Sequence, residues 1–251
     1  GFFPVVQSAE RDADLVEIES PPRAGLTKLR IQCRALHEAV SVERGDLVET
    51  DVAICGDTIV GVFGSYEGRR TIDVSGKILV PGFIDTHLHI ESSLVTPHEF
   101  DRCVLPYGVT TVICDPHEIA NVLGARGVRL MHDEAMAQPI NVFVQAPSCV
   151  PSAPGLETPG ATLSAEEVAQ MMAWPNIIGL GEMMNFPGVI AKDKKMLAEI
   201  AATQRAGKTV GGHYAAPDLG RPFAAYVAGG PADDHEGTRK EDAIARVRNG
   251  M

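Results

Sequence analysis

The stretch LVPGFIDTHLHIESS, residues 79–93, ends shortly after two histidines that are separated by one residue, His87 and His89. Its apolar first half has the character of a buried strand. Side chains of a strand repeat with a period of two, so both imidazoles point to the same side, roughly 7 Å apart along the chain. That is close enough for both to bind one cation. The spacing alone does not distinguish metal ligands from two polar residues that a strand happens to carry.

The chain around this stretch alternates strands with helices from Lys77 onward. Runs with strand character cover residues 78–89, 109–114, 140–146, 177–183, 209–213 and, more weakly, 232–235. Patterns with helical spacing separate these runs, and Ser164 with Glu167 forms a capping box ahead of one of them. Such alternation predicts βαβ units and a parallel sheet.

Two architectures accommodate six βα units. A doubly wound sheet usually carries a GxGxxG turn after its first strand, and this chain has none there. A (β/α)8 barrel places its reactive residues on the loops that follow the strand C-termini, which is where the polar residues of interest lie. The expected fold class is therefore α/β, a partial (β/α)8 TIM-type barrel over residues 81–251 that is truncated before strands 7 and 8.

Residues 1–80 have a different character. The run DVAICGDTIVGVFG contains two short β-rich segments around Gly56 and Asp57, which predicts a hairpin. We expect residues 1–80 to form a small β-rich segment, part of a β-sandwich that flanks the barrel. The sequence lacks an initiating Met and stops within a helical pattern, so we expect an N-terminal fragment of a longer protein.

Composition limits the possible partners. The net charge is -11, which argues against affinity for nucleic-acid backbones or anionic membranes. No apolar run has the length of a membrane span, and residues 1–17 do not resemble a signal peptide. The five cysteines form no CxxC pair, which is typical of reduced thiols in the cytoplasm. We expect a cytoplasmic protein that acts on a small-molecule substrate, as a monomer or as a homo-oligomer.

Five of the eight histidines fall at the ends of predicted strands. These are His87, His89, His117, His213 and His235, and Glu182 ends another strand. Taken singly, His117 is more often a structural residue than a ligand, and Glu182 could be a solvated loop residue. As a set they would converge on one rim of a barrel. His98 and His132 lie in helical patterns and are expected on the surface or on a helix face, and His37 lies in an unassigned region.

Four imidazoles and one carboxylate suit divalent Mn, Fe or Zn. One cation would leave ligands over, whereas two cations bridged by a carboxylate would use His87, His89, Glu182, His213 and His235. Two such cations lower the pKa of a water between them and polarise the group under attack, and a nearby carboxylate or imidazole then carries the proton. This is machinery for hydrolysis at an electron-poor carbon. Serine-hydrolase and P-loop motifs are absent from the sequence.

Several motifs carry a resemblance to a known family. PGFIDTHLHIESS resembles the first-strand motif of the amidohydrolase superfamily, whose members are metal-dependent (β/α)8 hydrolases. Together with HIESS, the blocks DPHEIANVLG, APSCVPS, GLGEMMNFPGV and DHE resemble the bacterial-type adenine deaminases within it. The resemblance runs from about residue 50 to the end and implies hydrolysis of adenine to hypoxanthine and ammonia, a purine-salvage reaction.

The resemblance also implies roles for individual residues. His87 and His89 would hold a first metal, His213 and His235 a second, and Glu182 would bridge them. His117 and Glu118 are candidates for proton transfer or ring-nitrogen contact, with orientation of the ligands as the alternative. Candidate substrate contacts lie in loops that match the family motifs, namely Glu91, Asp115 and Ser148. Two divalent cations are expected, Mn²⁺ or Fe²⁺ in first place and Zn²⁺ as a third possibility.

The chain departs from the family pattern at its end. The metal-binding Asp expected at strand eight is not in the sequence, so we expect the 251-residue chain itself to be inactive. Pro231 enters the sixth-strand block, where it removes a ladder donor. Another amidohydrolase acting on a cyclic amide or aminated heterocycle is the nearest alternative, and a non-catalytic relative is the second. Glu182 argues against the cyclic amidases, which usually have a carboxylated Lys there, and no Lys occurs between Lys77 and Lys192.

Overall fold

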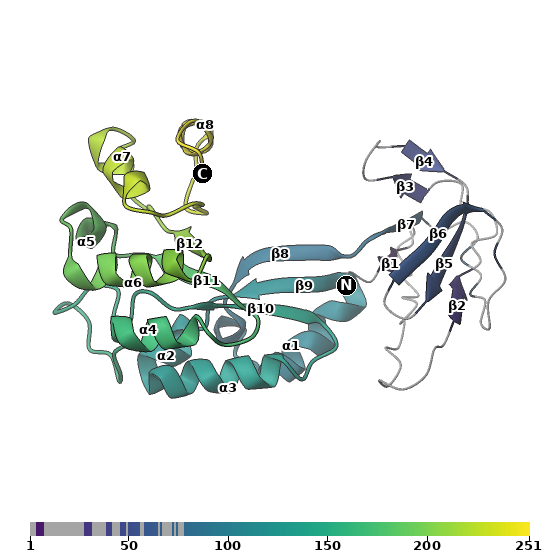
Figure 1. Ribbon diagram of the computed structural model, residues 1–251, viewed down its shortest axis with the longest axis horizontal. Helices are drawn as coiled ribbons and strands as arrows, with labels where there is room; N and C mark the ends of the chain where they lie inside the picture. The colour runs from purple at the N-terminus through teal and green to yellow at the C-terminus, as the bar shows by residue number, and fades with distance from the viewer. Residues whose placement is uncertain are drawn as a thin grey trace. The chain divides into compact units, whose positions relative to one another are not determined.

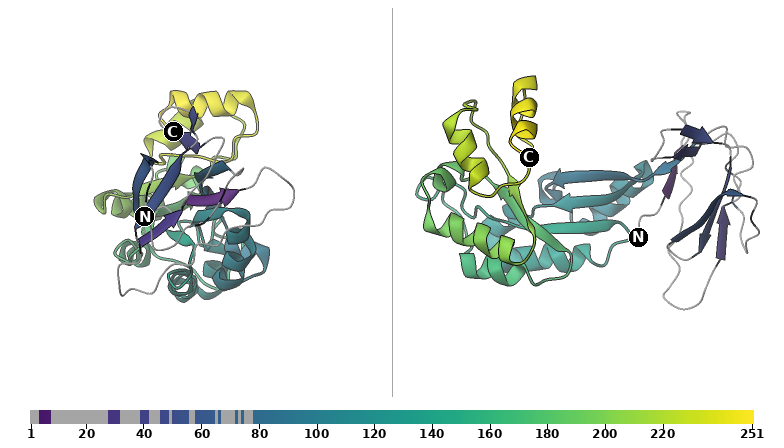
Figure 2. Two further views of the ribbon diagram at one scale, coloured as in Figure 1. Left: turned by 90° about the vertical axis from the view of Figure 1, so that its right-hand side faces the viewer. Right: turned by 45° about the horizontal axis from the view of Figure 1, so that its top comes forward.

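A computed structural model describes residues 78–251 without a break. Before them it describes residues 4–7, 28–31, 39–41, 46–48, 50–55, 58–64, 66, 72 and 74. The chain divides into two units, drawn in Figures 1 and 2. One comprises Gly1–Asp85 with Asp101–Thr111 and Pro139–Asn141, and the other comprises Thr86–Phe100, Val112–Gln138 and Val142–Met251. His37 lies outside the described residues.

A curved five-stranded parallel sheet positions the site. Its strands are β8 (Phe83–Leu88), β9 (Val109–Cys114), β10 (Asn141–Ala146), β11 (Ile177–Met183) and β12 (Thr209–Gly212). Their order across the sheet follows the sequence, from β8 at one edge to β12 at the other. Fully buried apolar side chains such as Val112, Val144 and Leu180 fix the register of the central strands. The α/β class and the partial-barrel character are thus confirmed.

Helices connect these strands, as the apolar spacing predicts. They are α1 (Pro97–Val104), α2 (His117–Leu123), α3 (Ala125–Ala135), α4 (Ala165–Met171), α5 (Phe186–Ile190), α6 (Lys194–Arg205), α7 (Arg221–Ala228) and α8 (Lys240–Arg248), with 3-10 turns η1 (Ile90–Ser93) and η2 (Leu105–Tyr107). The capping box of Ser164 and Glu167 is present. Among the described helices, none is both long and apolar enough to cross a bilayer.

The N-terminal region is β-rich. β5 (Asp51–Cys55) and β6 (Thr58–Gly64) form the expected antiparallel hairpin, and β2 (Lys28–Ile31) pairs with β5. The turn residues Gly56 and Asp57 lie outside the described residues. Two further antiparallel pairs join β3 (Ala39–Ser41) to β4 (Asp46–Val48) and β1 (Pro4–Gln7) to β7 (Ile78–Pro81).

The predicted first strand, residues 78–89, is broken into two. β7 ends at Pro81 and β8 begins at Phe83, and the two belong to different sheets. Gly82 lies at the break because the backbone there passes close to Thr110: a Cβ at this position would lie 2.0 Å from the Thr110 hydroxyl oxygen. The apolar pattern does not reveal this break, because the apolar run ILVPGFI, residues 78–84, continues across it.

The predicted sixth strand, residues 232–235, is an irregular segment. Pro231 has no N–H, and Ala232 makes one backbone bond to the carbonyl of Val210 on β12. The next two residues accept hydrogen bonds through their side chains: Asp233 from the N–H of Gly212 at 3.0 Å and Asp234 from the N–H of Tyr214 at 2.6 Å. These two carboxylates therefore accept hydrogen bonds from backbone N–H groups that a sixth strand would have paired with, and the parallel sheet has five strands.

A buried carboxyl on α6 makes the stability of this unit dependent on pH. Glu199 is 0% exposed, neither of its oxygens has a hydrogen-bond partner, and the nearest cation, Lys195 Nζ, lies 3.6 Å away. Burial, only partly offset by Lys195, raises the pKa of Glu199 to about 8. The unfolded carboxyl ionises near pH 4.5, so unfolding releases a proton between these values and stability falls as the pH rises through that window.

Glu199→Gln should therefore stabilise the protein at pH 8 more than at pH 5. One pKa unit corresponds to 1.36 kcal/mol, so we expect the gain over wild type to grow by on the order of 3 kcal/mol between the two pH values. Thermal unfolding at both pH values measures it. Glu166→Gln, at an exposed position of α4, is the matched control and should show no such growth. An equal effect of Glu199→Gln at both pH values would contradict this account.

Candidate metal centre

Glu182, at the end of β11, is the centre of the candidate site. Its side chain is 4% exposed, and five imidazoles surround its two carboxylate oxygens. The N–O distances are 3.6 Å for His87, 3.3 Å for His89, 3.1 Å for His117, 2.5 Å for His213 and 2.9 Å for His235. Residues up to 148 positions apart in sequence thus meet at one carboxylate because parallel strands end at a common edge.

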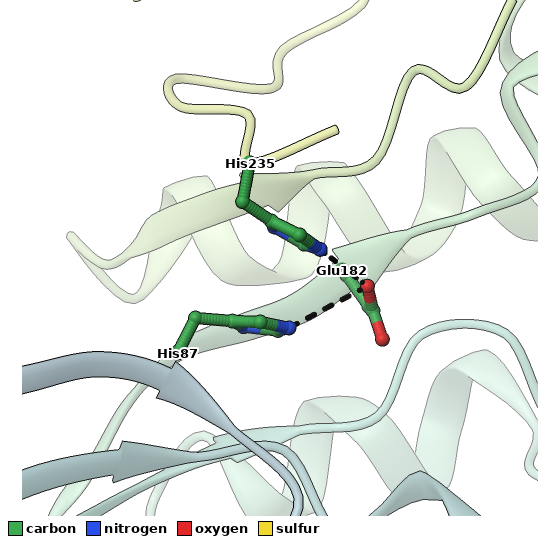
Figure 3. A group of neighbouring side chains, drawn as sticks. All are labelled: His87, Glu182 and His235. Atoms are coloured by element: carbon green, nitrogen blue, oxygen red, sulfur yellow. Dashed lines mark ion pairs between the residues drawn. The ribbon is translucent and has the colours of Figure 1, made fainter. Parts of the chain in front are cut away.

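The two histidines of the opening stretch lie at the end of β8 and directly after it. Their ring centroids are 4.9 Å apart, and both Nε2 atoms face Glu182. The ring of His87 stacks on that of His235 with 3.8 Å between the centroids, and Figure 3 shows both imidazoles directed at the Glu182 carboxylate, His87 from β8 and His235 from the irregular segment 232–235. The pair therefore points into the cluster, as the strand period predicts.

His117 and Glu118 open helix α2 next to this pair. The ring centroids of His117 and His89 are 4.4 Å apart, and His117 Nδ1 lies 3.1 Å from Glu182 Oε1. Glu118 Oε2 lies 3.6 Å from His89 Nδ1 and 3.7 Å from His117 Nε2. His89, His117 and Glu118 form one group that could hold a cation, beside the group of His87, Glu182 and His235.

A third group is formed by His213, His235 and Glu236. Glu236 Oε1 lies 3.6 Å from a ring nitrogen of each histidine. Glu236 is a member of the cluster that was not predicted from the sequence. Its position directly after a strand-end histidine, in the DHE triplet, was the available signal.

The three expected substrate contacts lie around this cluster. Asp115 and Ser148 are both 1% exposed, and each contacts the backbone of Glu182: Asp115 Oδ2 accepts from its N–H at 3.0 Å, and the Ser148 hydroxyl donates to its carbonyl at 2.7 Å. Glu91, in η1, accepts from the N–H of Ile119 on α2. The geometry of Asp115 and Ser148 is therefore that of residues which hold Glu182 in place.

Two other histidines lie in helices. His98 is largely exposed and contacts Gln138. His132 is 2% exposed and bonds the carbonyl of Pro175 at 2.7 Å, so it is a buried residue of the α3 face and not a surface one.

The carboxylate and imidazoles shift one another's ionisation. Burial alone would disfavour the charged form of Glu182, but hydrogen bonds from His117, His213, His235 and His89 hold its pKa far below the usual range. Burial likewise opposes protonation of His89, and its hydrogen bond to Glu182 raises its pKa to about 9. Glu182 is therefore ionised at any ordinary pH.

The remaining shifts follow the same physics. Burial opposes protonation of His117, yet hydrogen bonds to Asp115 and Glu182 raise its pKa to about 11. The hydrogen bond to Glu182 raises the pKa of His235, whereas burial and the neighbouring His235 lower that of His87. Because a ligating imidazole must be neutral at the ligating nitrogen, cations bound here would displace protons.

The donor set fits divalent cations. Imidazole nitrogens and carboxylate oxygens are the ligands of borderline first-row metals. Buried oxygens of Glu91, Asp115 and Glu118 lack hydrogen-bond partners, an arrangement that a cation or a substrate would satisfy. A cavity of about 370 Å³ adjoins the cluster, lined by His87, Glu182 and His235 together with inward-facing strand residues such as Gln145. The cluster therefore combines a cation-binding donor set with space for a small molecule.

The chain is similar in sequence to curated proteins. The chain is 64% identical over 218 residues to adenine deaminase 3 of Rhizobium meliloti (strain 1021), which covers 84% of this chain and 37% of that protein. It is 69% identical over 182 residues to an adenine deaminase of Ruegeria pomeroyi, covering 72% of this chain and 30% of that protein. The chain thus spans about a third of the length of the curated relatives it matches.

Solved structures share the fold at low identity. A variant of atrazine chlorohydrolase from Arthrobacter aurescens TC1, complexed with zinc and atraton, superposes with a TM-score of 0.63 at 16% identity, covering 88% of this chain and 64% of that one. Guanine deaminase from C. acetobutylicum, with guanine in its active site, gives 0.52 at 11% identity, covering 90% and 66%. The model of the amidohydrolase family matches residues 78–222, more than half of the chain. This chain belongs to the amidohydrolase family.

Proposed function

We propose that the complete protein is a metal-dependent adenine deaminase that converts adenine and water to hypoxanthine and ammonia. The observation that carries the proposal is the cluster of five imidazoles around Glu182, in a chain 64% identical to a protein named adenine deaminase. A cytoplasmic location, a place in purine salvage and a possible homo-oligomeric state belong to the same proposal.

The proposed ligand roles follow the family pattern, and the convergence of these side chains on Glu182 supports them. His87 and His89 would hold one divalent cation, His213 and His235 would hold a second, and Glu182 would be shared between them. Mn²⁺ or Fe²⁺ is the proposed metal, with Zn²⁺ as the alternative. Bound cations supply a hydroxide nucleophile at neutral pH and polarise the ring carbon under attack.

His117 and Glu118 are the proposed proton carriers. Hydrogen bonding from Ser92 and the charge of His117 keep the pKa of Glu118 below its usual value despite burial, so this carboxylate is ionised and can accept a proton. Its Oε2 lies 3.7 Å from His117 Nε2, which links it to the cluster. Glu118 then passes the proton towards the departing amine. Orientation of His89 by the same two residues is the alternative role.

Glu91 is the proposed contact to the purine ring. Burial raises the pKa of this carboxyl, and one of its oxygens is buried without a hydrogen bond. A carboxyl that keeps its proton more readily than usual can donate a hydrogen bond to an acceptor nitrogen of the ring. Asp115 and Ser148 are proposed to act on the substrate indirectly, by fixing Glu182.

Removing the metal tests the function. We expect the full-length protein to release ammonia from adenine, to lose this activity after dialysis against a chelator, and to regain it when Mn²⁺, Fe²⁺ or Zn²⁺ is restored. Hydantoin and dihydropyrimidine substrates serve as controls and should not be hydrolysed. Hydrolysis of a cyclic amide in place of adenine would show that the protein is an amidohydrolase with a different substrate. Purification without stoichiometric metal would favour a non-catalytic relative.

A further inference from the structure

A buried ion pair, Asp234 with Arg246, contacts the chain next to His213 and His235. Arg246, on α8, contacts Asp234 Oδ1 through Nε at 2.8 Å and through Nη2 at 2.7 Å. The side chains of Asp234 and Arg246 are 0% and 7% exposed. Nothing in the proposed reaction uses either residue. A buried charge pair is costly to form unless its hydrogen bonds are satisfied, so its contacts indicate what it organises.

Those contacts go to the backbone beside the two histidines. Asp234 Oδ2 accepts from the N–H of Tyr214, the residue after His213, at 2.6 Å, and Asp234 Oδ1 accepts from the N–H of Glu236, the residue after His235, at 2.8 Å. Arg246 Nη2 donates to the carbonyl of Tyr214 at 3.2 Å. The pair thus holds the backbone of both histidine-bearing segments at once.

This support is specific to one half of the cluster. Four side-chain hydrogen bonds join Asp234 and Arg246 to other residues. Three of them reach the backbone of residues 214 and 236, and the fourth runs from Arg246 Nη1 to the carbonyl of Asp242 on α8 itself. His87 and His89 are instead carried by β8, whose neighbour is β9. In Figures 1 and 2, α8 lies beside α7, and the Arg246 guanidinium also packs over Phe223 of α7 at 5.6 Å.

We propose that the Asp234–Arg246 pair is a positioning clamp for the second cation site, the one assigned to His213 and His235. The inference rests on the proposed two-cation centre and adds to it residues that touch neither cation nor substrate. The clamp fixes the two segments relative to each other, so that both imidazoles meet the same oxygen of Glu182. Without it, the second cation should bind more weakly while the first, on His87 and His89, is retained.

The test is a Zn²⁺ titration of the metal-free full-length protein against a chromophoric chelator. We expect wild type to bind two equivalents and Arg246→Met to bind the first with unchanged affinity and the second roughly 10- to 100-fold more weakly, the usual cost of losing such a supporting contact. Arg246→Lys keeps the charge but not the planar fork, so it should restore part of the second affinity. Arg248→Met, an exposed position on the same helix, is the matched control and should behave as wild type.

The outcomes separate this inference from the proposed function. If wild type binds no stoichiometric Zn²⁺, the two-cation centre itself is wrong. If wild type binds two equivalents and Arg246→Met and Arg246→Lys also bind both as tightly, the clamp is wrong and the centre stands. Equal weakening of both sites would also overturn the clamp, because a general loss of structure does not distinguish the two cations. Should Arg246→Met fail to fold by circular dichroism, Arg246→Lys decides the matter by the same criterion.

Discussion

Replacing Glu182 with Gln is expected to remove both bound cations and, with them, ammonia release from adenine. The substitution keeps the size of the side chain and removes the charge that five imidazoles share. Breaking a buried charged cluster by removing one partner costs about 3–5 kcal/mol. Expressed in full as lost cation affinity, this cost corresponds to a fall of roughly 10²- to 4 × 10³-fold, at about 1.4 kcal/mol for each factor of ten. Metal analysis of the purified full-length variant measures the loss directly.

A matched variant separates this effect from a general effect of charge. Glu166→Gln removes one carboxylate from an exposed position of α4 and should leave metal content and activity unchanged. In Glu182→Gln, the pKa of His89 should fall from its value of about 9, since burial would then act without the carboxylate that opposes it. A Glu182→Gln protein that keeps two cations per chain would show that the carboxylate is not the bridge.

The sequence carried enough information to predict which side chains meet, because strand ends in a parallel barrel share one rim. The His87–His89 pair, His213 and His235 are far apart in the chain, and the structure brings their imidazoles to the Glu182 carboxylate. Their assignment to particular cations remains a prediction. That reasoning needs only the order of strands and the polarity of the residue that follows each one.

What the sequence could not reveal depends on side-chain contacts between distant segments. Asp115 and Ser148 were predicted to contact the substrate from loops, and that contact stays a prediction. The sequence did not reveal that both are buried and hydrogen-bonded to the backbone of Glu182. The sixth strand was predicted from the run at 232–235, but Asp233 and Asp234 accept the N–H groups of the neighbouring segment. A carboxylate that accepts a hydrogen bond from the backbone cannot be distinguished by sequence from one that binds a cation, because both follow a strand.

Replacing Gly181 with Ala is expected to disrupt the centre without touching any proposed ligand. A Cβ at this position would lie 2.2 Å from Asp115 Oδ2 and 2.6 Å from its Cγ, so the Asp115 side chain would have to move. Overpacking of a filled interior costs about 1–3 kcal/mol. Asp115 Oδ2 is also the acceptor for the N–H of Glu182, so its displacement shifts the bridging carboxylate as well. We expect lower thermal stability and reduced metal content in the full-length variant.

Gly211→Ala supplies the comparison, because the nearest atom to its Cβ would be the carbonyl oxygen of Leu180 at 3.1 Å, and we expect a smaller effect there. If the clash with Asp115 is the cause, Asp115→Ala should relieve it. The stability loss of the double variant Gly181→Ala/Asp115→Ala should then be smaller than the sum of the two single losses, because residues in contact are not additive. Additive losses would mean that Gly181 acts through some other neighbour. Non-additive losses would show that Gly181 acts through Asp115, which links β11 to the proposed cation site by holding Glu182 in position.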